Sequence, residues 1–249
     1  MNPMARSYTE HFETRGTAYE RAMTRFPKAR DEEFAQLVQA AAIVGAMRVA
    51  DIPAGGGYLA RHLPPDCEWL GHEPCASFTN HGNNAATSVP LLPLPWADNS
   101  IDCAVSLAGV HHLDDKRPLF AEIARVLKPG GRLVLSDVQQ DSPVAKFLDE
   151  FVGAHNSTGH EGIYLNDDTP HLLTAAGFRV EQVAQQQFFW RLATREQLGD
   201  FCWQLFDLQS ASPAQTVAAI DDYLGFTHFA DGTVGMHWQL TTITAVTHD

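Results

Sequence analysis

Residues 49–60 read VADIPAGGGYLA. The stretch begins as a short apolar run, bends over Gly55, Gly56 and Gly57, and continues into a helix-forming segment. Glycines at a strand-to-helix turn let the backbone come close to a ligand and direct amide groups at it. The bend alone is a weak signal, because dinucleotide-binding enzymes, other nucleotide-binding proteins and plain tight turns all use one.

An acid at the end of the next predicted strand strengthens the signal. Residues 69–73 read WLGHE and place Glu73 where a carboxylate accepts hydrogen bonds from ribose hydroxyls. The pair predicts an adenosine-containing ligand, against the alternative of a solvated turn with a surface glutamate. Both NAD and S-adenosylmethionine are compatible with a glycine bend followed by a strand-end acid. The segment GGGYLA matches the dehydrogenase fingerprint G-x-G-x-x-G except that alanine stands last, so the bend does not distinguish the two cofactors.

Strand-like and helix-like segments alternate along the first part of the chain. The strand-like segments are MRVADI (47–52), CEWLGH (67–72), IDCAVSL (101–107) and RLVLSDV (132–138). An amphipathic helix, KRPLFAEIARVLKPGG (116–131), precedes the last of these and stops at Pro-Gly-Gly. Such alternation is typical of βαβ units and a parallel sheet.

Composition excludes several classes of protein. The 249 residues carry a formal net charge of −13 and no Lys/Arg cluster, which disfavours nucleic acid and anionic membrane partners. The four cysteines form no C-x-x-C pair and the amino terminus is polar, so reduced thiols and a cytoplasmic location are expected.

The chain divides into two predicted regions. Residues 1–46 are expected to form a helical leader whose Tyr8, Phe12 and Tyr19 fold over a ligand as a lid. Residues 47–249 are expected to form the ligand-binding domain, with a helical insertion at about 190–228 that caps the substrate. Aromatic residues gather around that insertion, and some of them are expected to roof an apolar pocket: Phe188, Phe189, Trp190, Phe201, Trp203 and Phe206.

Two longer segments resolve the choice of cofactor. Residues 90–115, PLLPLPWADNSIDCAVSLAGVHHLDD, and residues 120–137, FAEIARVLKPGGRLVLSD, resemble the class I S-adenosylmethionine-dependent methyltransferases. The resemblance covers residues 47–138 and is closest to the small-molecule branch that includes quinone-biosynthesis enzymes. It implies an α/β, Rossmann-like fold with a seven-stranded mixed sheet, helices on both faces, and an antiparallel last strand, MHWQLTTITAVT (236–247).

The resemblance also implies a cofactor site. The family's D-h-G-x-G-x-G motif falls on residues 51–57, so that Ala54, Gly55 and Gly57 would line the methionine part of the cofactor. Asp51 belongs to the same cofactor site and is expected to orient the glycine loop through backbone amides. Glu73 would hold the ribose. The residues implied beside the adenine are Leu94, Pro95 and Trp96, and those implied under the sulfonium are Leu107 and His112.

Two positions depart from the family pattern. Pro53 replaces the first glycine of the motif, and its ring fixes φ and removes an amide donor. We expect the bend to keep its shape, because Gly55 and Gly57 remain. An acid that many relatives place before the L-P step is also missing, since Val89, Pro90 and Leu91 stand there.

Catalytic residues are harder to assign, because methyl transfer from a sulfonium mainly requires orientation of the reactants. A general base is needed only for an acceptor that carries a proton. The polar loop GAHNSTGHEGIY (153–164) offers His155 or His160 as a proton acceptor, with a hydrogen-bonded surface loop as the alternative. His111 and His112 follow a predicted strand at its ligand-binding edge. No metal site is expected, because no Cys/His spacing typical of zinc is present.

The sequence therefore predicts an enzyme that transfers a methyl group from S-adenosylmethionine to a small, partly apolar, neutral or cationic acceptor. A catalytically inactive protein that binds S-adenosylmethionine or S-adenosylhomocysteine is the alternative, because of Pro53. An NAD-dependent oxidoreductase is a more distant alternative, since no Tyr-x-x-x-Lys pair is placed as a short-chain dehydrogenase needs it. The oligomeric state is not predicted.

Overall fold

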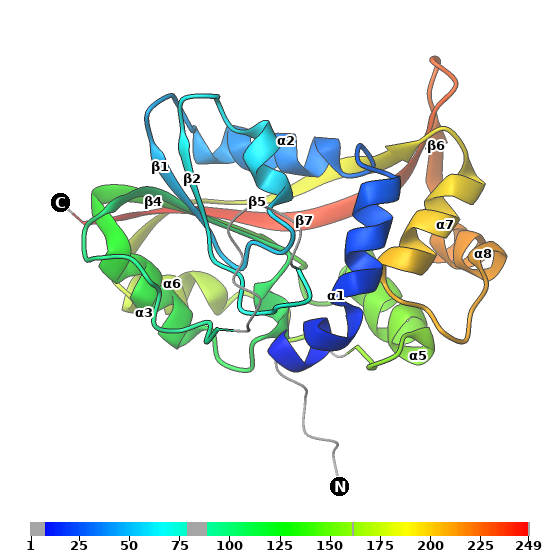
Figure 1. The fold of residues 1–249 in the computed structure, drawn as a ribbon, viewed down its shortest axis with the longest axis horizontal. Coiled ribbons are helices and arrows are strands. Elements are labelled where there is room, and N and C mark those ends of the chain that lie inside the picture. Colours follow the sequence, from blue (N-terminus) through cyan, green and yellow to red (C-terminus); the bar gives the residue numbers. More distant parts are fainter. Residues whose placement is uncertain (1–7, 79–88, 161, 249) are drawn as a thin grey trace, which may run out of the picture.

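A mixed sheet of seven strands runs through the protein (Figure 1). The computed structural model describes residues 8–78, 89–160 and 162–248. In chain order the strands are β1 (Arg48–Asp51), β2 (Glu68–Gly71), β3 (Ile101–Leu107), β4 (Leu127–Asp137), β5 (Phe178–Leu192), β6 (Phe226–His228) and β7 (Val234–Thr247). Their order in space is β2-β1-β3-β4-β7-β5, with β6 paired to β7. Neighbours among β2, β1, β3 and β4 are parallel, and β7 is antiparallel to β4, β5 and β6. The predicted α/β class and the antiparallel last strand are confirmed.

The central strands are apolar on both faces, which is why they lie inside the fold. In β1, Val49 points into one core and Ala50 into the other. In β3, Cys103 and Val105 join the first core and Ala104 joins the second. Side chains alternate across a strand, so a continuous apolar run requires cover on both sides of the sheet.

Helices supply that cover. They are α1 (Tyr8–Arg25), α2 (Asp31–Ala41), α3 (Arg117–Val126), α4 (Pro143–Lys146), α5 (Gly153–His155), α6 (Thr169–Ala175), α7 (Arg195–Leu205) and α8 (Pro213–Tyr223), and a π-helical turn (Phe147–Val152) joins α4 to α5. Figure 1 shows α2 above the sheet and α3 and α6 below it, while α1 stands beside α7.

The amino-terminal helices are built into the core. Three acids, Asp31, Glu32 and Glu33, occupy the first turn of α2. Their negative charges stabilise the helix, because the amino-terminal end of the helix dipole is positive. Phe34 and Leu37 of α2 are buried in the same core as strands β1, β3 and β4. The helical character of this region is confirmed, and its division from the rest of the chain as a lid stays a prediction.

Two local expectations are corrected. The helix-forming segment after the bend is a 3₁₀ helix (Tyr58–His62). The insertion expected at about 190–228 is helical only to Tyr223, because Gly225 adopts a φ of +88° that leaves the helix. Phe226 then starts β6. A strand of three residues has too short a pattern to be predicted from the sequence, and this one forms because β7 extends far enough to pair with it.

Candidate active site

The glycine bend leaves β1 at the carboxyl edge of the parallel strands. Ile52 N donates to Val105 O (3.0 Å) and Ala54 N donates to His72 O (3.0 Å), so the bend is tied to both neighbouring strands. Gly55 and Gly57 have φ values of +52° and +73°, which L side chains rarely adopt. The Ile52–Pro53 bond is cis. Pro53 lies at the start of the bend and lines the cavity described below.

Glu73 follows β2 by two residues in the chain, and its side chain contacts the bend. Its Oε2 accepts hydrogen bonds from Gly55 N (2.8 Å) and the Tyr8 hydroxyl (2.8 Å), and its Oε1 accepts one from Cys75 N (2.8 Å). Burial raises the pKa of Glu73, although these three hydrogen bonds act to lower it. The carboxylate thus already accepts a hydroxyl hydrogen bond, which is the chemistry that a ribose requires.

A first cavity opens above the bend. It is bounded by Asp51, Ala54 and Gly55 below, by Leu107 at the end of β3, and by α1 above. Nothing lies within 4 Å of the position that a Cβ on Gly55 would take, so the bend borders free space. The residues of α1 that line it are Tyr8, Phe12 and Tyr19, the three expected in a lid. The donors, the open bend and the carboxylate fit an adenosyl amino acid.

Other predicted cofactor residues lie away from this cavity. Gly57 begins the 3₁₀ helix instead of lining it. Leu94 is buried in the core under α3, and its amide donates to Glu122 Oε2 (2.9 Å). Trp96 packs its ring edge-on to His72, with 6.1 Å between centroids. The structure does not bring Leu94 and Trp96 to the cavity wall.

Asp51 at the end of β1 is buried and faces the same cavity. Burial raises its pKa to about 8, a hydrogen bond from Trp69 Nε1 (3.2 Å) lowers it, and the Glu73 charge raises it. The neutral form of the Asp51 carboxyl is therefore favoured at pH 7 in the folded protein.

A dependence of stability on pH follows from Asp51. Because its pKa in the folded protein exceeds the ordinary value of about 3.9, the folded state binds this proton more tightly than the unfolded chain does. The contribution is complete below about pH 4 and is lost as pH rises toward 8. The free energy of unfolding, measured with urea and without cofactor, should fall less between pH 5 and pH 8 for Asp51→Asn than for the wild type. Equal declines in both proteins would refute this assignment.

A second cavity adjoins the first. The two share Phe12, Tyr19, Arg30, Leu107 and Ala108. The remaining wall of the second cavity includes three histidines and three large aromatic residues: His111, His112, His160, Trp190, Phe206 and Trp238. Of the aromatic residues expected to form a roof, Trp190 and Phe206 do line this cavity, and Trp238 of β7 was not anticipated.

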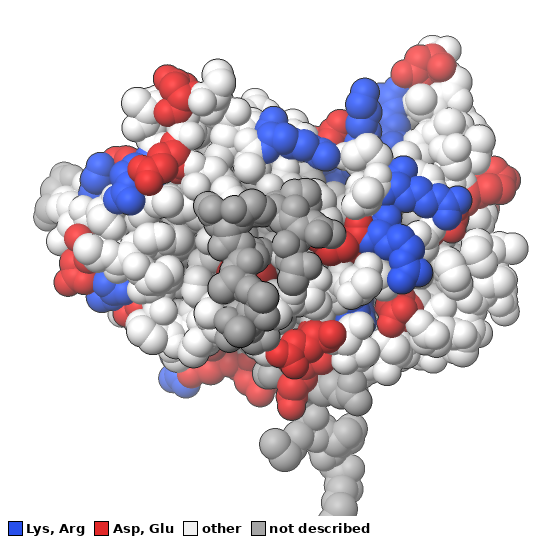
Figure 2. Space-filling view, viewed as in Figure 1, with Lys and Arg blue, Asp and Glu red and all other residues white. Residues whose placement is uncertain are grey.

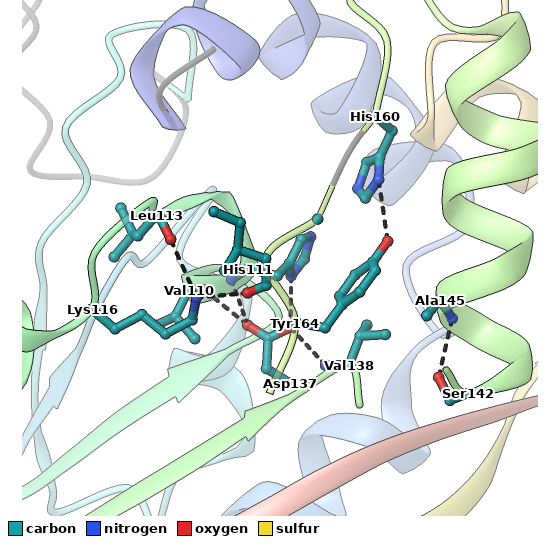
Figure 3. Close-up of polar contacts among 12 residues, drawn as sticks. Val110, His111, Leu113, Lys116, Asp137, Val138, Ser142, Ala145, His160 and Tyr164 are labelled. Carbon is teal, nitrogen blue, oxygen red and sulfur yellow. Dashed lines mark hydrogen bonds and ion pairs between the residues drawn. The ribbon is translucent and has the colours of Figure 1, made fainter. Parts of the chain in front are cut away.

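Asp137 at the end of β4 orients one of these histidines (Figure 3). It is fully buried, and its oxygens accept hydrogen bonds from His111 Nδ1 (2.6 Å), Val110 N (2.9 Å), His111 N (3.2 Å) and Val138 N (2.7 Å). Burial alone would raise the pKa of Asp137, but the charge and hydrogen bonds of His111 and the Val138 amide lower it. Sequence reasoning missed Asp137, although an acid that ends a buried strand is the same signal that singled out Glu73.

The structure separates the two candidate proton acceptors. His160 is buried against the second cavity, and its Nδ1 lies 3.2 Å from Asp149 Oδ1, which also accepts from the Tyr164 hydroxyl (2.5 Å). Burial lowers the pKa of His160 to about 4, against the opposing hydrogen bond to Asp149. His155 does not line either cavity and pairs with Ser210 Oγ (2.8 Å).

Histidines that are distant in sequence meet in the second cavity. His111, His112 and His160 each offer a ligand atom, and these atoms lie within 4.8 Å of one another. Burial and the neighbouring His111 charge lower the pKa of His112 well below its usual range. Neutral imidazoles are ligands for divalent transition metals. Sequence spacing did not suggest this cluster, because the fold and not a local motif assembles it.

Comparison with known proteins agrees with this geometry. Residues 50–135 match the methyltransferase domain family. The O-methyltransferase cnsE of Penicillium expansum is 39% identical over 98 residues, which are 37% of this chain and 33% of that protein. The chain thus spans well under two thirds of the relative's length.

Solved structures share the fold across nearly the whole chain. An S-adenosylmethionine-dependent methyltransferase of Thermotoga maritima has a TM-score of 0.59 at 18% identity, covering 95% of this chain and 98% of that one. The [4+2]-cyclase SpnF has a TM-score of 0.55 at 16% identity, covering 99% and 98%. Since one of these proteins is named for a different reaction, the fold alone does not define the chemistry. Residues 50–135 therefore match a methyltransferase domain, and the chain as a whole has the fold of S-adenosylmethionine-dependent methyltransferases.

Proposed function

We propose that this protein transfers a methyl group from S-adenosylmethionine to a small-molecule acceptor bound in the second cavity. The supporting observation is the contact of Gly55 N and Glu73 Oε2 (2.8 Å), which joins the open bend to a carboxylate that accepts hydroxyl hydrogen bonds. Bound S-adenosylmethionine would supply an electrophilic methyl group on sulfur.

The roles of the chain's own residues follow from the two cavities. Glu73 would accept the ribose hydroxyls, and the bend at Ala54 and Gly55 would hold the amino-acid end. Leu107 borders both cavities and so marks where cofactor and acceptor meet. Residues of helix α1 line both cavities, so this helix would exclude water from the junction. Orientation of the reactants in line would account for most of the acceleration.

A small acceptor agrees with the surface of the protein. On the face drawn in Figure 2, Lys and Arg side chains alternate with Asp and Glu and form no continuous basic surface of the kind that binds nucleic acid. Among the described helices, none is both long and apolar enough to cross a bilayer. The four cysteines are free thiols, which supports a cytoplasmic location.

The proposed function is tested first by binding and then by turnover. Calorimetry with S-adenosylmethionine, S-adenosylhomocysteine and NAD should show binding of the first two compounds only. Incubation with labelled S-adenosylmethionine and fractionated metabolite pools should then yield a labelled product. Binding of NAD alone, or cofactor binding with no labelled product from any pool, would contradict the proposal.

His160 is the proposed proton acceptor for an acceptor that carries a hydroxyl. Its Nδ1 is engaged by Asp149, which leaves Nε2 as the atom that can receive a proton. His160→Gln should lower kcat with the identified acceptor by about 100-fold, the low end of general-base contributions. His155→Gln is the matched control and should stay within about twofold, since His155 pairs with Ser210 outside both cavities. Equal kcat values for both variants would remove His160 from the mechanism.

A further inference from the structure

One buried cation in the second cavity lacks a partner. Arg15 of α1 lines this cavity and is 3% exposed, yet its Nε and Nη1 atoms have no hydrogen-bond partner among the described residues. Its guanidinium lies 5.8 Å from the centroid of the Phe12 ring. Buried charges in native proteins are normally paired, because an unpaired one loses its hydration without compensation.

The other charged groups around the cavity do not neutralise Arg15. Arg30 and Glu33 pair with each other through Nε–Oε2 (2.5 Å) and Nη2–Oε1 (2.8 Å). Glu33 also accepts a hydrogen bond from Trp190 Nε1 (2.8 Å). Asp207 favours the charged form of Arg15, but its oxygens accept hydrogen bonds from Ser157 Oγ (2.6 Å) and Gln209 Nε2 (2.7 Å). Burial lowers the pKa of Arg15 to about 10, so the guanidinium remains charged at pH 7.

A second donor in the same wall also lacks a partner. Trp238 is 4% exposed, and its Nε1 has no hydrogen-bond partner among the described residues. An indole nitrogen and a guanidinium can only donate. The donors of Arg15 and Trp238 that lack a partner would therefore be satisfied by a ligand that carries hydrogen-bond acceptor atoms. Around them, the stacked rings of Trp190 and Trp238 (4.1 Å between centroids) form an apolar wall.

The same charge argues against a metal ion at the histidine cluster. Arg15 acts electrostatically on His112 and His160, where it contributes to lowering both pKa values after burial and the neighbouring histidines. A divalent cation at these imidazoles would face an unneutralised guanidinium. An anion would instead accept hydrogen bonds from Arg15 and reduce this repulsion.

We infer that the second cavity binds a small carboxylic acid with an aromatic body, whose carboxylate pairs with Arg15 while its ring packs on Trp190 and Trp238. This inference rests on the proposed function, of which it names the substrate class. It reverses the expectation of a neutral or cationic acceptor, which came from the net charge of the whole chain. The net charge lies mostly at the surface, whereas selection of the ligand depends on the charge inside the cavity.

Three probes that share a 4-hydroxyphenyl ring test the inference: 4-hydroxyphenylacetate, its neutral amide, and tyramine. Binding is measured by tryptophan fluorescence and calorimetry with S-adenosylhomocysteine present. The acid should bind at least about tenfold more tightly than the other two, as expected for a charge-assisted hydrogen bond. Arg15→Gln should abolish this preference and leave the affinity for the amide within about twofold. Arg21→Gln, an exposed arginine on the same helix, is the matched control and should bind like the wild type.

A second measurement separates a binding role from a structural one. Without ligand, Arg15→Met should melt at the same temperature as the wild type or higher, since it removes an unpaired buried charge. A lower melting temperature, equal binding of the three probes, no binding of the acid, or acid binding that requires Zn²⁺ and survives Arg15→Gln would each overturn the inference. Acid binding through Arg15 without any methyl transfer would instead refute only the proposed function.

Discussion

Replacement of Glu73 by alanine is expected to weaken S-adenosylmethionine binding by about 10- to 100-fold. Hydrogen bonds to a charged group contribute about 1.5–3 kcal/mol, and each 1.4 kcal/mol is about a tenfold change in affinity. The Glu73→Ala variant would lack the carboxylate that contacts the ribose. It would also lack the acceptor for Gly55 N, whose hydrogen bond holds the bend in place. Both losses act on the same ligand, so the upper part of the range is expected.

The matched control for this variant lies on the preceding strand. Glu68 of β2 is exposed and pairs with Arg48 (2.7 Å), so Glu68→Ala changes the net charge equally without touching the first cavity. Calorimetry should show wild-type affinity for Glu68→Ala. Glu73→Gln should fall between the two, because an amide keeps one acceptor oxygen. A folded Glu73→Ala variant with wild-type affinity would show that the cofactor lies elsewhere.

Asp137→Ala is expected to lower the free energy of unfolding by about 3–5 kcal/mol, as for removal of one partner from a buried, charged hydrogen-bond network. The substitution leaves the amides of Val110, His111 and Val138 and the His111 ring without their acceptor inside the protein. These groups have little access to water, because Val110, His111 and Val138 are themselves buried.

Urea unfolding at pH 7 measures this effect. Asp114→Ala removes an exposed acid from the neighbouring turn and should change the free energy of unfolding by less than about 0.5 kcal/mol. Asp137→Asn should lose less than Asp137→Ala, since its carbonyl oxygen still accepts from some of the donors. If Asp137→Ala unfolds like Asp114→Ala, the network at the end of β4 contributes little to stability.

The sequence predicted the fold through features that act over short distances. The bend at residues 51–57, the acid Glu73, and the alternation of buried strands with amphipathic helices each depend on backbone geometry or on the period of apolar residues. These local rules were sufficient for the parallel strands and for the edge where the proposed cofactor site lies. The antiparallel last strand was predicted only from the resemblance to the methyltransferases. They were also sufficient to name Tyr8, Phe12 and Tyr19, because their helical spacing and their place before β1 were visible in the chain.

The second cavity could not be predicted in the same way, because its wall is assembled from segments far apart in sequence. Arg15 comes from α1, His111 from the turn after β3, His160 from a loop after α5, and Trp238 from β7. No spacing in the chain relates these residues. Arg30 pairs with Glu33 three residues later on the chain, whereas the fold brings no hydrogen-bond acceptor among the described residues to Nε or Nη1 of Arg15. The sequence by itself determined the domain and its cofactor edge, since short-range periodicity encodes both. Only the tertiary structure decided which charges remain unpaired inside the cavity, because pairing and loss of water depend on contacts between distant elements.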